Sequence, residues 1–315
     1  MQAAVCTSFG GPEVLEVREI ERPKPGPGEI LVRVRAAAMN PIDAKLRSGQ
    51  FRLVFRISPP FVPGFDFAGE IVEPGEGAGG FQAGQRVFGS TRRPGTHAEY
   101  VCVPAELAVS IPPEVPVEAA GAAPGSALTA LAVLEDRLRV TAGQEILING
   151  ASGGVGSYAV QIARERGARV TAVASAANHA LLRDLGAAEC IDYHEEDFAA
   201  RARAFDAIFD VVPNRSFPEC RSALKPAGTY VTTIPGPGPL FWKVATRLLP
   251  LAGGKRAEFV MLRPERASLL RLAELLGSGS IRSVVSERIP LERVRDAHER
   301  MQSGHTTGKM VLRMG

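Results

Sequence analysis

A glycine-rich segment in the middle of the chain has the residue types of a dinucleotide-binding turn. Residues 150–156 follow a short apolar run and carry the spacing A-x-G-x-x-G at Ala151, Gly153 and Gly156. A helical hydrophobic period begins at Tyr158, so the order is strand, tight turn, helix. Small residues at this spacing let the backbone approach a pyrophosphate, and the free amides and dipole of a helix N-terminus favour an anion. Such turns also serve packing alone, but both flanks favour dinucleotide binding.

The strand expected at residues 169–174 lacks an acid at its end. NAD sites usually place a carboxylate about twenty residues past the glycines, where it holds the ribose 2′-hydroxyl. No Asp or Glu occurs from Val170 to Leu182, and Ser175 stands where the strand should end. A 2′-phosphate would meet no repulsion there, so the sequence favours NADP over NAD.

Length and composition indicate an ordinary globular protein. The chain has 315 residues, 45% of them hydrophobic, which is enough for two domains. The net charge is +3 and there are no runs of like charge, so the sequence gives no indication of nucleic-acid binding. No segment approaches a membrane span and the N-terminus lacks a signal core, so we expect a cytoplasmic protein without membrane contact. The four cysteines lie far apart, and we expect them to be reduced.

The pattern of elements changes along the chain. Short strands separated by Gly and Pro clusters fill residues 1–120 and predict a small barrel-like β domain. Composition shifts sharply around residues 111–125, where we place the domain boundary. Strands alternate with helices over residues 121–262, which predicts βαβ units and a parallel sheet. Residues 263–315 hold further helices and strands that could return to the first domain.

Two predictions concern the second half in more detail. A helix is expected to run through Leu224, with a turn at residues 225–228 and a strand that ends at Ile234. Residues 240–251 form an apolar stretch, which we interpret as a helix that covers the sheet; a wall of the substrate pocket or a subunit contact are the alternatives.

Several short motifs, in order, resemble the zinc-free quinone oxidoreductases (zeta-crystallin-like) of the medium-chain dehydrogenase/reductase superfamily. The motifs are Asn40–Gly49, Val62–Gly69, Leu128–Ala130, Asn149–Gly156, Leu185–Ala187, Ile191–Tyr193, Leu224–Pro226 and Thr307–Lys309. The resemblance implies an α/β protein with a GroES-like catalytic domain (1–120), a Rossmann doubly wound parallel sheet (121–262) and a C-terminal segment (263–315) that rejoins the first domain. It also implies an NADPH site in the cleft between the domains and a homodimer.

The resemblance assigns residues to the cofactor. They are Thr129 near the nicotinamide, Ser152, Gly153, Gly154, Val155 and Gly156 in the glycine loop, Ser175, Asn178 and Tyr193 at the 2′-phosphate, and Ile234 and Lys309 close by. Asn178 departs from the pattern, because relatives that bind NADPH well often have Lys or Arg there. Pro213 is a second departure, because relatives often have glycine after the strand that we expect at residues 207–212.

Asn40 and Asp43 are the candidates for contact with the reacting groups. Hydride transfer from a nicotinamide needs positioning, polarisation and exclusion of water. Asn40 can hydrogen-bond the ribose or a substrate carbonyl, and Asp43 can orient it or a water molecule. The alternative is that Asn40 and Pro41 form a turn and that Asp43 caps a helix through residues 45–49.

No metal is expected. By similarity, Asn40 and Phe65 occupy the positions of a cysteine and a histidine that hold catalytic zinc in relatives, and neither offers the N or S ligand that zinc selects. Asp43 and Asp66 remain, and two carboxylates alone make a poor zinc site. The five histidines have no metal-binding spacing and are expected to be surface or structural residues.

These observations favour a zinc-independent, NADPH-dependent oxidoreductase that reduces a quinone or an α,β-unsaturated carbonyl by hydride transfer. An enoyl-thioester reductase of the same superfamily and a nucleotide-binding scaffold with little turnover are the alternatives. A short-chain dehydrogenase is excluded, because no tyrosine has a lysine four residues later.

Overall fold

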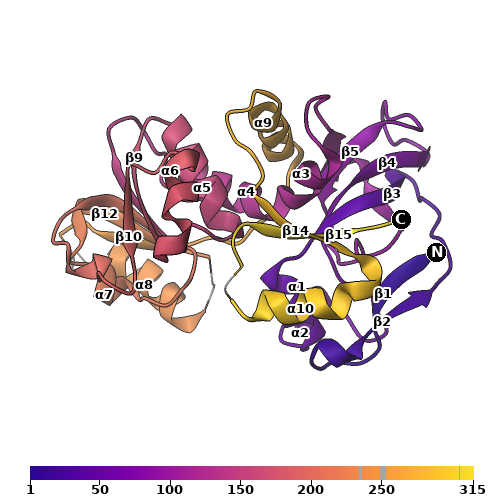
Figure 1. Cartoon of the computed structure of the whole chain (residues 1–315), viewed down its shortest axis with the longest axis horizontal. Helices are drawn as coiled ribbons and strands as arrows, with labels where there is room; N and C mark the ends of the chain where they lie inside the picture. The colour runs from indigo at the N-terminus through magenta and orange to yellow at the C-terminus, as the bar shows by residue number, and fades with distance from the viewer. Residues whose placement is uncertain (234–235, 249–252, 305) are drawn as a thin grey trace. The chain divides into compact units, whose positions relative to one another are not determined.

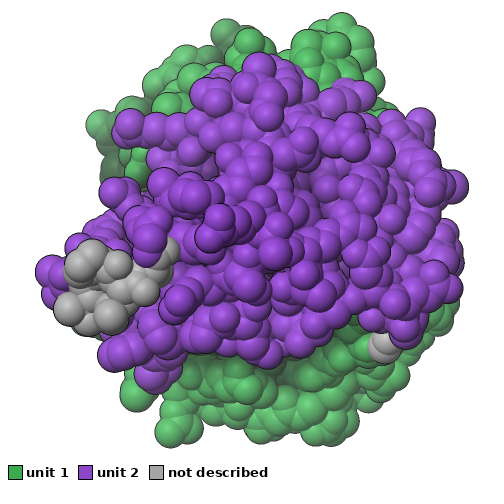
Figure 2. Space-filling view, turned by 90° about the vertical axis from the view of Figure 1, so that its left-hand side faces the viewer, with its two compact units in different colours: residues 1–128, 263–315 green, residues 129–262 purple. Residues whose placement is uncertain are grey.

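The computed structural model describes residues 1–233, 236–248, 253–304 and 306–315. The chain folds into two compact units: unit 1 comprises residues 1–128 and 263–315, and unit 2 comprises residues 129–262. Figure 2 shows unit 1 in green and unit 2 in purple. The composition change placed the domain boundary after residue 120, whereas the units divide between Leu128 and Thr129.

Unit 1 is built on a seven-stranded sheet with the order β14-β15-β3-β4-β5-β7, and β6 pairs with β3. Its strands are β3 (Glu29–Ala38), β4 (Asp66–Pro74), β5 (Arg86–Ser90), β6 (Tyr100–Pro104), β7 (Ala108–Ser110), β14 (Val285–Pro290) and β15 (Lys309–Arg313). A separate antiparallel pair consists of β1 (Gln2–Cys6) and β2 (Leu15–Glu19). Apolar side chains of β3, β4, β5 and β15 form the core of the unit.

The C-terminal segment returns to the first part of the chain. Strand β15, yellow in Figure 1, pairs antiparallel with β3 through Val311 and Ala38, and it pairs in parallel with β14. This segment therefore completes the sheet of unit 1 and confirms that part of the predicted fold.

The helices of unit 1 are short. They are α1 (Pro41–Arg47), α2 (Arg52–Phe55), α3 (Val117–Ala122), α4 (Pro124–Leu131, which continues into unit 2), α9 (Arg266–Gly277) and α10 (Val294–Gln302). Single 3₁₀ turns occur at Pro12–Val14, Ala105–Leu107 and Leu291–Arg293. Helix α10 contacts α1, which follows β3 directly. None of the helices in the described ranges is long and apolar enough to cross a membrane.

Unit 2 contains a six-stranded, all-parallel sheet with the order β10-β9-β8-β11-β12-β13. The strands are β8 (Glu145–Asn149), β9 (Arg169–Ala174), β10 (Glu189–Asp192), β11 (Phe205–Asp210), β12 (Leu224–Thr232) and β13 (Arg256–Phe259). Strands β8, β9 and β11 are buried almost throughout, as in parallel sheets covered on both faces. The strand order reverses between β8 and β11, and in open α/β sheets ligands bind at the carboxyl ends of the strands at such a point. The predicted Rossmann sheet and α/β fold class are confirmed.

The helices of unit 2 are α5 (Gly154–Glu165), α6 (His179–Leu185), α7 (Phe217–Cys220) and α8 (Pro237–Leu248). A π-helical segment spans Ala132–Arg137, and 3₁₀ turns span Ala176–Asn178 and Phe198–Ala200. The helix predicted through Leu224 is wrong: α7 ends at Cys220, and Leu224 already pairs with Phe205 as the first residue of β12. Pairing with the neighbouring strand decides this segment against its local pattern. The predicted end of the apolar stretch at residues 249–251 lies outside the described residues.

Candidate active site

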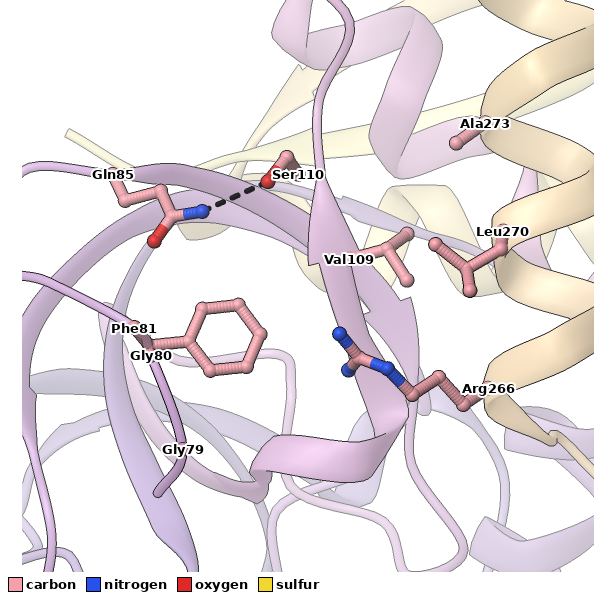
Figure 3. Close-up of a pocket in the computed structure, with 9 residues that line it drawn as sticks. All are labelled: Gly79, Gly80, Phe81, Gln85, Val109, Ser110, Arg266, Leu270 and Ala273. Carbon is pink, nitrogen blue, oxygen red and sulfur yellow. Dashed lines mark hydrogen bonds between the residues drawn. The ribbon is translucent and has the colours of Figure 1, made fainter. Parts of the chain in front are cut away.

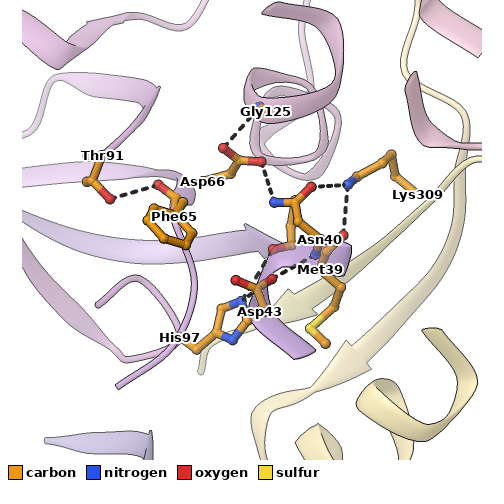
Figure 4. Close-up of polar contacts among 10 residues, drawn as sticks. Met39, Asn40, Asp43, Phe65, Asp66, Thr91, His97, Gly125 and Lys309 are labelled. Atoms are coloured by element: carbon orange, nitrogen blue, oxygen red, sulfur yellow. Dashed lines mark hydrogen bonds and ion pairs between the residues drawn. The ribbon is translucent and has the colours of Figure 1, made fainter. Parts of the chain in front are cut away.

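Asn40 lies at the centre of a buried polar network in unit 1 (Figure 4). Its Nδ2 donates to Oδ2 of Asp66 at 2.8 Å, and its Oδ1 accepts from Nζ of Lys309 at 2.6 Å. Lys309 also donates to the carbonyl oxygen of Met39 at 2.8 Å. The backbone N–H of Asn40 donates to Oδ2 of Asp43 at 2.7 Å. The structure thus brings together the predicted residues Asn40, Asp43 and Lys309, and adds Asp66.

Three neighbouring strands position these side chains. Strand β3 ends at Ala38, and Asn40 is the N-cap of α1, with Pro41 as the first helical residue. Asp66 begins β4 and Lys309 begins β15, the two strands that flank the end of β3. The network is therefore held by sheet pairing, which fixes side chains more firmly than a loop does.

Asp43 caps α1 and also belongs to the buried network. The alternative in which Asp43 caps a helix agrees with the hydrogen bond that its carboxylate accepts from the backbone N–H of Asn40. That helix begins at Pro41, however, and not at Lys45. Burial raises the pKa of Asp43 to about 7, an effect that the backbone N–H of Asn40 opposes and the charge of Asp66 reinforces. At neutral pH this carboxyl therefore lies near its titration midpoint, as groups that transfer protons often do.

Burial also acts on the two charged partners of Asn40. It raises the pKa of Asp66, and the charge of Lys309 and hydrogen bonds from Asn40 and Ser90 oppose that rise. It lowers the pKa of Lys309, which the charges of Asp66 and Asp43 oppose. Mutual attraction thus favours the charged forms of both groups, and desolvation disfavours them.

His97 was expected to be a surface or structural residue, and the structure places it, fully buried, beside Asp43. Its Nε2 lies 3.3 Å from the carbonyl oxygen of Ala38 and 4.0 Å from Oδ2 of Asp43. Burial lowers the pKa of His97 to about 4, so the ring is neutral at pH 7. No spacing in the sequence indicated this contact, because His97 reaches the site through tertiary packing alone.

The predicted glycine loop of unit 2 joins β8 to the N-terminus of α5. A Cβ atom at Gly156 would lie 2.2 Å from the carbonyl oxygen of Gly150, so only glycine lets the helix sit this close to the loop. A Cβ atom at Gly153 would meet nothing closer than 3.4 Å, so the protein leaves the backbone accessible there. Gly154 and Val155 open the helix, and the amides of a first helical turn have no intrahelical acceptor. Ser152 precedes them and is half-buried. The loop fits a diphosphate on these grounds.

Ser175 and Asn178 lie together after β9. Nδ2 of Asn178 donates to Oγ of Ser175 at 3.1 Å, and the amides of Gly150 and Ala151 donate to Val173, so the glycine loop adjoins this strand end. Tyr193 follows β10 and is 51% exposed. Ser175, Asn178 and Tyr193 therefore follow the carboxyl ends of two neighbouring strands, β9 and β10.

Ser175 stands where an acid is missing, but an acid, Asp192, ends the neighbouring strand β10. Oδ2 of Asp192 accepts from the amide of Ala176 at 3.1 Å, and its Oδ1 accepts from the amide of His194 at 2.9 Å. The hydrogen bond from His194 is the largest of the causes that lower the pKa of Asp192. Both of its oxygens are thus engaged by backbone amides, a detail that sequence reasoning missed.

The remaining predicted residues are Thr129 and Ile234. Thr129 is half-buried at the start of unit 2, and Ile234 lies outside the described residues. Asn149, beneath the glycine loop, donates to Asp210 at 2.9 Å and to Asn214 at 2.8 Å, and this link between β8 and β11 was not predicted.

Figure 3 shows a pocket in unit 1, of about 340 Å³, whose lining residues do not include any residue of the network. Phe81, Val109 and Leu270 contribute apolar surface, and Arg266 is its charged residue. The guanidinium of Arg266 donates to the carbonyl oxygens of Ala105 and Ala108 and lies 5.8 Å from the ring centre of Phe81. None of the predicted site residues lines this pocket.

The residues do not fit a catalytic zinc ion. Phe65 is buried and its ring lies 5.4 Å from that of Phe55, while Asn40 already accepts from the ammonium group of Lys309. A cation held at that distance opposes a second, divalent cation. In the part of the chain that the structure describes, no group of three or more His, Cys, Asp or Glu side chains could hold a metal ion.

Two family models match the chain. Residues 26–113 match the alcohol dehydrogenase GroES-like domain, and residues 185–312 match a model described as zinc-binding dehydrogenase. The first match lies in unit 1 and agrees with the predicted GroES-like domain.

Individual relatives cover almost the whole chain. A chloroplast envelope quinone oxidoreductase homolog of Arabidopsis thaliana is 32% identical, over 99% of this chain and 98% of its own. A trans-enoyl reductase of Aspergillus terreus is 32% identical, over 92% of this chain and 87% of its own. The solved structure of a mycobacterial protein complexed with NADPH has a TM-score of 0.86 at 29% identity, with all of both chains covered. The chain therefore belongs to the quinone oxidoreductase family of the medium-chain dehydrogenase/reductase superfamily.

Proposed function

We propose that the protein is a zinc-independent oxidoreductase that uses NADPH to reduce a quinone or an α,β-unsaturated carbonyl. The observation that carries this proposal is the glycine loop, which leaves the backbone at Gly153 accessible beside the unpaired amides of α5. Full-length similarity to a quinone oxidoreductase homolog supports the choice of substrate class.

The cofactor would be held by residues of unit 2. Ser152, Gly154, Val155 and Gly156 would contact the diphosphate through backbone amides, and Gly153, whose own amide donates to Gly150, would leave room for its approach. Ser175, Asn178 and Tyr193 would contact the 2′-phosphate. When bound, the cofactor supplies a hydride from nicotinamide C4. Preference for NADPH is supported by the uncharged Ser175 at the end of β9.

Zinc independence is supported by the donor set around Asn40. A divalent metal would find no suitable ligand in the amide of Asn40, the phenyl ring of Phe65 or the ammonium group of Lys309. We infer that Asn40 acts in place of the metal by contact with a substrate oxygen. Asp43, with a pKa raised to about 7, could supply or hold a proton nearby.

A panel assay of NADPH oxidation tests the proposal. The purified protein is assayed with 1,2-naphthoquinone, with a simple enone and with an enoyl thioester, and NADPH affinity is measured separately by titration. We expect turnover with the quinone or the enone. Tight NADPH binding without oxidation by any acceptor would instead support a nucleotide-binding scaffold.

A second candidate is an enoyl-thioester reductase, because a trans-enoyl reductase has the same 32% identity to the chain as the quinone oxidoreductase homolog, although over a smaller share of it. A kcat/KM for the thioester at least ten times that for the quinone would favour this candidate.

We also propose a homodimer, located in the cytoplasm. Leu240, Phe241, Val244 and Leu248 of α8 form an exposed apolar stripe on unit 2. Within the described residues, β13 pairs only with β12 and so has one open edge. An apolar face and an open edge are features that a second copy can cover. Sedimentation equilibrium and cell fractionation test these two points.

A further inference from the structure

The side-chain amide of Asn40 is held between two partners of opposite polarity (Figure 4). The ammonium group of Lys309 only donates, so the atom of Asn40 that faces it at 2.6 Å is the oxygen. Oδ2 of Asp66, 2.8 Å away, accepts from the nitrogen of Asn40, and Oδ1 of Asp66 accepts from the amide of Gly125 at 3.0 Å. The orientation of the Asn40 amide is therefore fixed by its neighbours.

One hydrogen of this amide is left over. An asparagine nitrogen carries two hydrogens, and Asp66 takes one of them. The second has no acceptor among the residues that the structure describes. Asn40 is also the most exposed of the three residues, at 9%, compared with 4% for Lys309 and 0% for Asp66. Of the three residues, Asn40 therefore offers the most surface to a ligand.

We propose that Lys309 and Asp66 are positioning residues that orient Asn40, so that its remaining N–H donates to the carbonyl oxygen of the substrate. This inference rests on the proposed function. Lys309 then acts through Asn40, and not on the cofactor directly as the family resemblance implied. The positive charge of Lys309 draws electron density from the Asn40 oxygen, which makes the N–H a stronger donor.

The reaction gives such a donor a specific task. When bound, NADPH would supply a hydride, and with it both electrons, to the quinone or enone, so that one substrate oxygen becomes an anion. A proton from water then neutralises the hydroquinone anion or enolate. A fixed N–H aimed at the developing oxyanion stabilises the transition state more than the ground state.

The opposite orientation of the amide needs different charges. Its nitrogen could face Lys309 only if Lys309 were uncharged, and its oxygen could face Asp66 only if Asp66 were protonated. Desolvation pushes both groups in that direction, whereas their mutual attraction, with the charge of Asp43 adding to it for Lys309, opposes the change. The hydrogen bond from Gly125 also favours the ionised form of Asp66.

An exchange of the two side chains tests the inference. In the double variant Asn40→Asp/Asp66→Asn, the new carboxylate at position 40 still accepts from Lys309 and from the new amide at position 66. That amide still accepts from Gly125, and the hydroxyl of Ser90 can adapt as donor or acceptor. Net charge and shape are retained, while the free N–H is lost and the carboxylate moves from position 66 to position 40.

We expect the double variant to keep its melting temperature within a few degrees and its NADPH Kd within about threefold. Its kcat/KM should fall about 100- to 1,000-fold, as for the loss of one oxyanion donor in other enzymes. An active wild type together with a double variant within about threefold of its kcat/KM would overturn the inference and leave the proposed function intact. A wild type without any turnover would instead contradict the proposed function.

A second variant covers the case in which the exchange fails to fold. Lys309→Met keeps the length of the side chain but removes the donor, and we expect kcat to fall about tenfold with the NADPH Kd unchanged. Lys309→Arg should restore part of this loss. A large rise in the NADPH Kd with kcat retained would place Lys309 on the cofactor and refute the positioning role.

Discussion

Replacing Gly156 with alanine should displace the glycine loop of unit 2, whereas the same change at Gly153 should not. The added Cβ at position 156 would lie 2.2 Å from the carbonyl oxygen of Gly150 and 2.6 Å from Cα of Ala151. Both contacts are with backbone, so they cannot be relieved by rotation of a side chain. At position 153 the nearest atom is 3.4 Å away, and φ is −75°, which any residue adopts.

The geometry gives the size of the effect. Ordinary carbon contacts begin near 3.5 Å, so the loop at Gly156 must move by about 1.3 Å. Overpacking of this kind costs about 1–3 kcal/mol, and the better helix propensity of alanine returns up to about 1 kcal/mol. We therefore expect Gly156→Ala to lower the free energy of unfolding by about 0–3 kcal/mol. NADPH Kd should also rise at least tenfold, because the moved backbone carries the binding amides; tenfold corresponds to about 1.4 kcal/mol.

Gly153→Ala separates binding from stability. Its free energy of unfolding should stay within about 1 kcal/mol of the wild type, since the protein leaves room for the methyl group. The methyl group enters the space that we assign to the diphosphate, so NADPH Kd should again rise at least tenfold. Urea denaturation and fluorescence titration with NADPH measure the two quantities. If Gly153→Ala binds NADPH as tightly as the wild type, the assignment of the loop is wrong.

Three further predictions address the cofactor, the metal and a buried histidine. Ser175→Asp should weaken NADPH binding at least tenfold and leave NADH binding nearly unchanged, because the new carboxylate repels a 2′-phosphate; equal losses for both nucleotides would contradict the site. Dialysis against a chelator should leave turnover unchanged, and activity restored by zinc would refute zinc independence. His298 is fully buried, and within the described residues its ring nitrogens have no hydrogen-bond partner. Burial, with the charges of His97 and Arg47, lowers its pKa to about 2, so below pH 6.5 the unfolded chain binds the extra proton. This group alone should therefore lower the free energy of unfolding by about 1.4 kcal/mol per pH unit below pH 6.5. The variant His298→Gln should lack that part of the pH dependence. Urea denaturation of both proteins from pH 5 to 7 measures it, and parallel curves for the two proteins would contradict the prediction.

Local patterns in the sequence predicted the fold of unit 2 well. The apolar run, the glycines and the helical period of residues 145–165 became β8, the loop and α5. The helix expected through Leu224 failed, because its pairing with Phe205 depends on a strand nearly twenty residues earlier. A propensity window carries no information about that partner.

The candidate active site, like the fold, could be predicted from the sequence only in part. From the sequence alone, the spacing of the glycines, the uncharged Ser175 and the resemblance around Asn40 indicated a nucleotide-dependent oxidoreductase, because these features depend on residues close together in the chain. Only the tertiary structure placed Lys309, 269 positions away, on the oxygen of Asn40, and Asp66 on its nitrogen. It also buried His97 beside Asp43 and set Asp192 next to Ala176. Strand pairing and burial decide such contacts, and through them the polarity and charge of each group, so no reading of local spacing could supply them.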